Sequence, residues 1–128
     1  MQIIFGIFLI AHGIAHLVGF VTYWRIASFE EMPYKTTLLS DRVDVGDAGI
    51  RIVGIFWLLT GLAFAVLGIG VITLQPWWYP LIIYLSIFSL LMCILGWPDA
   101  RFGALINLII LAFLVLANNF GWLQLTSV

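Results

Sequence analysis

Four apolar runs, separated by short polar or aromatic breaks, make up most of the chain. They cover about residues 3–24, 50–74, 81–97 and 102–122. A helix rises about 1.5 Å per residue, so runs of this length suit a hydrocarbon core of about 30 Å. The pattern therefore predicts an all-α fold: an integral membrane, antiparallel up-and-down four-helix bundle that forms a single transmembrane domain over residues 1–128.

The polar positions are gathered in two places along the chain. A long polar loop spans residues 25–49, and a shorter turn spans residues 96–102. In an up-and-down bundle these two segments share one face of the membrane, and all five Lys and Arg residues lie on that face. The positive-inside rule then predicts a prokaryotic plasma membrane protein with this face in the cytoplasm and both termini outside.

Composition supports a lipid environment and removes several classes of function. Hydrophobic residues make up 64% of the chain and charged residues 9%, and the mean hydropathy is +1.19. The lipid bilayer is thus the first expected partner. Nucleic-acid binding is excluded because no basic patch could neutralise phosphates. The single cysteine, Cys93, cannot form a disulfide within the chain.

Small residues predict which helices pack most closely. The second apolar run carries glycine every seven residues, at Gly54, Gly61 and Gly68. The first run offers its own small residues on one face: Ala11, Ala15 and Gly19. Small faces let helices approach in lipid, where packing drives association. We therefore expect the first and second helices to form the main contact.

The chemically most suggestive stretch is residues 9–24, which holds His12 and His16, the two histidines of the protein. Four residues apart on a helix, both imidazoles fall on one side, near the middle of the membrane. An ionisable group at that depth is a functional hypothesis by default. The same stripe continues to Tyr23, toward the charged face.

Three interpretations of the histidines remain open. They bind a transition metal, for which a third ligand is lacking nearby. Haem held by both histidines of one chain is excluded because the rings share a helix face, whereas a haem site shared between subunits stays open. They form hydrogen bonds between helices. They line a pocket for a quinone-like or lipid ligand, or carry protons. The sequence requires no cofactor. The candidate hydrogen-bonding partners are Thr60, Ser86, Ser89 and Asn107.

Charged residues near the cytoplasmic face form a second candidate site. Asp47, Arg51, Asp99 and Arg101 could bind an anionic head group or substrate. The alternative is structural: Asp47 caps the second helix and pairs with Arg51, Asp99 pairs with Arg101, and the cluster ties the loop to the turn.

Three stretches resemble small bacterial and archaeal four-helix membrane proteins without an assigned activity and, more distantly, the DoxX-like superfamily. They are HGIAHLVGF at 12–20, DVGDAGIRIVGIFWLLTGLAF at 44–64 and WPDARFGALINLIIL at 97–111. The resemblance implies a compact four-helix bundle, often considered near quinone and sulfur redox chemistry. It transfers no catalytic residues to this chain.

Two functional hypotheses follow. The first is a non-enzymatic polytopic protein, either a self-associating homo-oligomer or an accessory subunit of a larger membrane complex. The second is a redox or ligand-binding membrane protein with a midplane pocket at His12 and His16 that opens toward the charged residues. Catalytic residues are not assigned, and whether the protein is an enzyme stays undecided.

Overall fold

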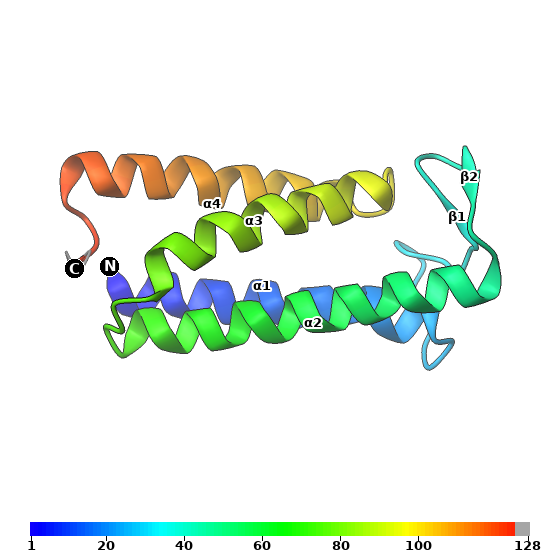
Figure 1. Cartoon of the computed structure of the whole chain (residues 1–128), viewed down its shortest axis with the longest axis horizontal. Coiled ribbons are helices and arrows are strands. Elements are labelled where there is room, and N and C mark those ends of the chain that lie inside the picture. The colour runs from blue at the N-terminus through cyan, green and yellow to red at the C-terminus, as the bar shows by residue number, and fades with distance from the viewer. Residues whose placement is uncertain (125–128) are drawn as a thin grey trace.

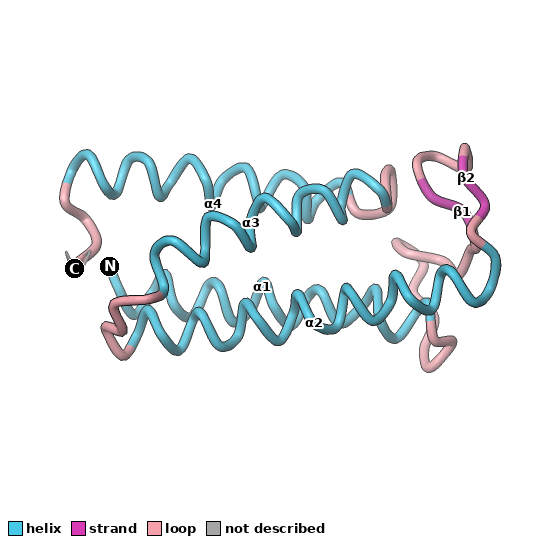
Figure 2. Tube along the Cα trace, in the orientation of Figure 1, coloured by secondary structure: helices cyan, strands magenta, loops and turns pink. Residues whose placement is uncertain are grey.

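The computed structural model describes residues 1–124. Over these residues the chain forms four long helices and a short β-hairpin. The elements are α1 (Gln2–Tyr23), β1 (Thr37–Leu38), β2 (Val43–Asp44), α2 (Gly46–Ile72), α3 (Trp78–Leu95) and α4 (Arg101–Phe120). The all-α prediction is confirmed, with the hairpin as a small addition to the polar loop (Figure 2). The last four residues of the expected domain, 125–128, lie outside the described part.

The helices form two layers that run along the length of the molecule. Figure 1 shows α1 and α2 together in one layer and α3 and α4 in the other. The hairpin and the α3–α4 turn lie at one end, and the start of α1, the end of α4 and the α2–α3 turn lie at the opposite end. The charged loop and the turn at 96–102 therefore share one end of the molecule.

Within the first layer, α1 and α2 touch backbone to backbone. A Cβ atom added to Gly61 would lie 2.6 Å from the carbonyl oxygen of Gly13, and one added to Gly13 would lie 2.5 Å from the carbonyl oxygen of Gly61. Gly6 and Gly68 approach one another in the same way, at 2.7 and 2.6 Å. No side chain larger than hydrogen fits at these positions, so the glycine repeat sets the α1–α2 distance.

The expected α1–α2 contact is thus confirmed, but the small face of α1 was assigned wrongly. The contacting residues are Gly6, Gly13 and Gly19, whereas Ala11 and Ala15 are exposed. The glycines repeat at six or seven residues, as the α2 glycines do, and that match in period brings them into register.

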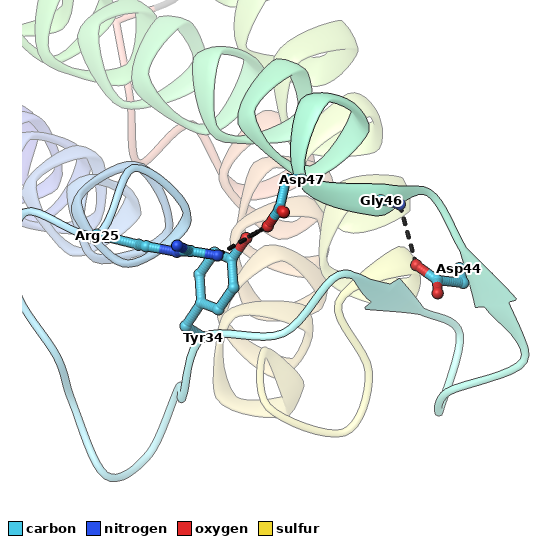
Figure 3. Close-up of polar contacts among 5 residues, drawn as sticks. All are labelled: Arg25, Tyr34, Asp44, Gly46 and Asp47. Carbon is cyan, nitrogen blue, oxygen red and sulfur yellow. Dashed lines mark hydrogen bonds and ion pairs between the residues drawn. The ribbon is translucent and has the colours of Figure 1, made fainter.

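The helix boundaries differ most at the start of α2. That helix begins at Gly46 rather than near residue 50, because the Asp44 carboxylate accepts a hydrogen bond from the Gly46 backbone N–H at 3.0 Å (Figure 3). Asp47 lies in the first turn and makes no capping hydrogen bond, so its predicted capping role is wrong. α3 likewise begins earlier, at Trp78, because Pro80 is tolerated in a first turn whose amides need no partner.

The hairpin docks onto the end of α3. The Leu39 N–H donates to the carbonyl of Leu95 at 2.8 Å, and the Ser40 N–H donates to the carbonyl of Trp97 at 3.0 Å. Carbonyls at a helix C-terminus lack partners within the helix, and the hairpin supplies them. Leu38 is buried beneath this contact. The loop is therefore a folded cover over one end of the bundle.

The interior consists of two apolar clusters with polar side chains between them. One cluster, around Leu9 and Phe64, fills the end that holds the chain termini. The other, around Trp57 and Cys93, fills the hairpin end. Between them lie buried polar residues contributed by all four described helices: His12, His16, Thr60, Ser86, Ser89 and Asn107.

All four described helices are long and apolar enough to cross a bilayer. Their outward surfaces are apolar too: Ile4, Leu59, Tyr84 and Val115 are each more than half exposed. A water-facing surface would carry charged side chains at such positions. These features indicate an integral membrane protein.

Candidate functional site: a buried histidine pocket

A hydrogen-bonded cluster joins the two helical layers at mid-height. His12 Nε2 lies 3.3 Å from Asn107 Oδ1, and His16 Nε2 lies 2.6 Å from Ser89 Oγ. Asn107 Nδ2 donates to Ser89 Oγ at 2.8 Å. The cluster therefore connects α1 with both α3 and α4. The sequence interpretation of the histidines as interhelical hydrogen-bonding groups is confirmed for Ser89 and Asn107.

Two backbone carbonyls set the direction of every bond in the cluster. Asn107 lies 2.9 Å from the Gly103 carbonyl, which only accepts, so the atom facing it is the amide nitrogen. His16 Nδ1 lies 2.9 Å from the His12 carbonyl and must donate to it. In a neutral ring His16 Nε2 then accepts from Ser89. Asn107 Oδ1 remains as acceptor for His12, so His12 carries its proton on Nε2.

The other two candidate partners do not join the cluster. The Thr60 hydroxyl donates to the carbonyl of Phe56 on its own helix at 2.7 Å. Ser86 Oγ is buried without a partner among the described residues. Aromatic rings complete the surroundings: Phe64 packs 4.7 Å from His12 and Trp57 packs 5.2 Å from His16, measured between ring centroids.

A cavity of about 200 Å³ adjoins the cluster. His12 and His16 line it from α1, Trp57 from α2, and Gly103 from α4. Its walls are almost entirely apolar apart from these groups and the acidic residues at its rim. An apolar cavity of about 150 Å³ accommodates benzene, so this volume suits one six-membered ring with a substituent.

The cavity has an opening toward the apolar outer surface of the bundle. Ala15 of α1 and Phe102 of α4 both line it, and both are exposed on the outer surface of the bundle. The seam between α1 and α4 therefore gives lateral access. Toward the hairpin end the cavity reaches Glu31, Met32 and Asp99.

Two buried nitrogen atoms on residues that line the cavity have no partner among the described residues. They are His12 Nδ1, which is a bare acceptor given the proton on Nε2, and Trp57 Nε1, which is a donor. The two residues are only 4% and 5% exposed. Five other buried side-chain atoms among the described residues also lack a hydrogen-bond partner: Gln2 Nε2, Thr22 Oγ1, Tyr23 OH, Ser86 Oγ and Asp99 Oδ2.

An ion pair fastens the loop beside the rim. Lys35 Nζ lies 2.7 Å from Asp99 Oδ2, and both side chains are largely buried. The loop and the α3–α4 turn are therefore tied together, as the structural interpretation of the charged cluster expected. The partner was wrong: Asp99 pairs with Lys35 and not with Arg101, whose guanidinium lies over the Phe102 ring instead.

The remaining charged candidates lie apart from the histidine pocket. Asp47 forms an ion pair with Arg25 at 2.8 Å and accepts a hydrogen bond from Tyr34 (Figure 3). The expected ion pair between Asp47 and Arg51 is wrong, because Asp47 pairs with Arg25, which lies just after α1. Arg51 packs over Trp24 and, with Asp47, borders a separate surface recess of about 550 Å³. The predicted opening of the pocket toward Asp47, Arg51 and Arg101 is therefore wrong.

The sequence interpretation included Tyr23 in the candidate site and did not include Trp57. Tyr23 is buried in the apolar cluster at the hairpin end, away from the cavity lining. Trp57 was missed; its ring lies against Gly19, where a Cβ atom would lie 2.6 Å away, and this contact between two helices has no signal in the sequence. Met32 and Glu31 reach the rim from a loop that carries no periodic pattern, so no signal predicted them.

Metal binding gains no support from the described residues, which contain no group of three or more His, Cys, Asp or Glu side chains able to hold an ion. No protein-family model, curated protein or solved structure matches the chain. The DoxX-like resemblance therefore stays an expectation from the sequence motifs, and the site has to be interpreted from its own chemistry.

Proposed function

We propose that the protein is a polytopic membrane protein that binds a small, membrane-soluble ligand in the pocket beside His12 and His16. The observation that carries this proposal is the cavity of about 200 Å³ lined by two buried residues whose ring nitrogens lack partners. A cluster that served only to join helices would need no such space, because an empty cavity costs stability. A bound ligand would fill it.

In this proposal the helices insert as an up-and-down bundle in a prokaryotic plasma membrane, with the hairpin end in the cytoplasm. All five basic residues lie in the segments at that end, which supports this orientation through the positive-inside rule. The ligand then reaches the site from the lipid, through the seam between α1 and α4.

Ala15 gives a clean test, because it lines the cavity and yet is exposed. Ala15→Phe places a ring in the cavity mouth without disturbing the α1–α2 contact. Ala11→Phe is the matched control: it puts the same ring on the same exposed side of α1, at a residue that does not line the cavity. The probes are 4-fluorophenol and 4-fluorotoluene. Their binding to the protein in nanodiscs is measured by fluorine NMR.

We expect at least one probe to show saturable binding above its partition into lipid. That binding should be lost in Ala15→Phe and retained in Ala11→Phe. If both probes partition linearly in the unmodified protein, or if the two variants behave alike, ligand binding at this pocket is wrong.

The alternative is the accessory or self-associating role. Its main support is the glycine repeat, but Gly61 and Gly68 pack against α1 of the same chain and so do not offer a surface to another subunit. Failure of the probe experiment together with co-purification of a fixed set of membrane subunits would favour the accessory role.

A further inference from the structure

We propose that a second site, the surface recess beside Trp24 and Arg51, binds an anionic glycerophospholipid, with the lipid phosphate at Arg51 and an acyl chain along the exposed isoleucines of α2. We call this surface the arginine recess. It shares no lining residue with the histidine pocket, so the inference is independent of the proposed function.

The arginine recess combines charged and apolar walls. Its volume is about 550 Å³. It is lined by two residues at the end of α1 and five residues of α2: Trp24, Arg25, Asp47, Ala48, Arg51, Ile52 and Ile55. Arg51, Ile52 and Ile55 are three or four residues apart on α2, so they share one helix face. Ile52 and Ile55 are 57% and 39% exposed and continue the recess as an apolar strip beyond the charged residues.

The three charges of the recess leave a surplus of one positive charge, which belongs to Arg51. Arg25 Nη2 lies 2.8 Å from Asp47 Oδ1, and the Tyr34 hydroxyl donates to the same carboxylate, so Arg25 and Asp47 offset one another (Figure 3). The Arg51 side chain forms no ion pair or hydrogen bond with the described residues. Its N–H donors therefore lack an acceptor within the described chain.

Trp24 holds this arginine beside the recess. The indole Nε1–H donates to the backbone carbonyl of Arg51 at 3.0 Å, and the Arg51 guanidinium carbon lies 5.7 Å from the centre of the indole ring. A tryptophan and an arginine in contact at a helix end are typical of the layer where lipid head groups meet the hydrocarbon.

The length of α2 places Arg51 at the depth of lipid phosphates. The helix has 27 residues and is about 40 Å long, whereas the hydrocarbon core is about 30 Å thick. Asp47 and Arg51 are the charged residues of α2, so the excess length lies at their end. Arg51 is about 8 Å from the start of the helix, which puts it near the boundary, with Ile52 and Ile55 on the hydrocarbon side.

The same features select an anionic lipid over other phosphates. An arginine fork matches the geometry and charge of a phosphodiester. The ammonium group of phosphatidylethanolamine would add a positive charge beside Arg25 and Arg51, and Asp47, the acid that would offset it, is already engaged. A soluble phosphate would gain nothing from the isoleucine strip. Phosphatidylglycerol has the required negative charge without the ammonium group.

Three probes distinguish these sources when each is titrated into the detergent-solubilised protein and followed by native mass spectrometry. The probes are phosphatidylglycerol and phosphatidylethanolamine with the same acyl chains, and glycerol 3-phosphate. We expect phosphatidylglycerol to bind about fivefold more tightly than phosphatidylethanolamine, because of the surplus charge. Glycerol 3-phosphate should neither bind saturably nor displace the lipid.

Arg51→Gln tests the phosphate contact, and Arg101→Gln is the matched control. Arg101 begins α4, is exposed, has its guanidinium over the Phe102 ring and does not line the recess, so its replacement removes the same charge from a similar setting. We expect the affinity for phosphatidylglycerol to fall about tenfold in Arg51→Gln and to change by less than about twofold in Arg101→Gln.

A measurement on the unmodified protein is independent of how the variants fold. The Arg51 Nε–H resonance, assigned by its loss in Arg51→Gln, should shift on addition of phosphatidylglycerol and stay in place with glycerol 3-phosphate. An unmoved resonance, equal affinity for the two lipids, displacement by glycerol 3-phosphate, or equal losses in Arg51→Gln and Arg101→Gln would each overturn the proposal.

Discussion

Asn107 makes the side-chain hydrogen bonds that join α4 to α1 and α3, and replacing it by leucine tests whether the polar cluster stabilises the bundle. Leucine has the same branched shape as asparagine, is somewhat larger and makes no side-chain hydrogen bonds. Asn107→Leu removes the bonds to His12 and Ser89, which link helices, and the bond to the Gly103 carbonyl within α4. It also leaves His12 Nε2–H buried without an acceptor.

The magnitude follows from the two interhelical bonds. Such bonds in membrane proteins contribute about 0.6 kcal/mol each on average and about 1.7 kcal/mol at most. Two of them give a loss of about 1 to 3 kcal/mol in the free energy of unfolding. The Gly103 carbonyl adds little, because it can still accept its helical hydrogen bond from the backbone of residue 107.

The assay is reversible unfolding in mixed micelles, where increasing fractions of denaturing detergent give the free energy of unfolding. Asn118→Leu is the matched control, because Asn118 lies on the same helix but is exposed on the outer surface. We expect this control to be neutral or slightly stabilising. A double-mutant cycle with Ser89→Ala should return a coupling of about 0.6 kcal/mol. Equal stability of Asn107→Leu and Asn118→Leu would refute the structural role of the cluster.

Three further variants test other contacts. Gly61→Ala places a Cβ atom 2.6 Å from the Gly13 carbonyl and should destabilise the bundle by about 2 kcal/mol in the same unfolding assay. Lys35→Gln breaks the ion pair with Asp99 and should speed proteolytic cleavage of the loop. Hydrogen bonds from the Gly46 N–H and then from the Thr36 side chain hold the pKa of Asp44 below its ordinary value. The stability that these bonds contribute is therefore fully present above the ordinary pKa and is lost as pH falls through the lowered pKa. Thr36→Val should raise the titration midpoint of Asp44, followed by carboxylate NMR.

Each of these variants has a control within the chain. Gly96→Ala meets no atom closer than 3.3 Å, and that atom is a side-chain methyl, so it should cost far less than Gly61→Ala. Arg42→Gln removes a loop cation that forms no ion pair with the described residues and should leave the cleavage rate unchanged. A Thr36→Val protein whose Asp44 titrates as before would show that Gly46 alone sets the pKa.

The fold was predictable where the length of the apolar runs and the spacing of the glycines indicate it. The four apolar runs gave the helices, and the seven-residue spacing of Gly54, Gly61 and Gly68 identified the face of α2 that packs on α1. The α1 partner face was harder, because alanine and glycine both count as small while only glycine permits the carbonyl approach at Gly13. The boundaries shifted where a local contact decides them, as Asp44 does at the start of α2.

The site was predictable only as far as helix geometry reaches. The position of His12 and His16 on one face and the polar residues at similar depth on α3 and α4 were enough to anticipate the bonds to Ser89 and Asn107. Ion pairs between charged loop residues depend on how the loop folds, and a hairpin with few periodic positions offers no pattern to follow. Lys35 therefore replaced Arg101 as the partner of Asp99, and Arg25 replaced Arg51 as the partner of Asp47.

The position of the cavity follows from the way the helices pair. Glycines hold α1 tightly against α2, and α3 lies against α4, so the two layers meet across the polar cluster. The seam between α1 and α4 is bridged there by the His12–Asn107 bond, and its lining includes Ala15 and Gly103, which are too small to fill it. A larger side chain at Ala15 would narrow the opening, whereas at Gly103 a Cβ atom would lie 2.8 Å from Cys93 Sγ. The small side chain of Ala15 leaves the cavity open at the outer surface of the bundle, and the proposed ligand would enter there.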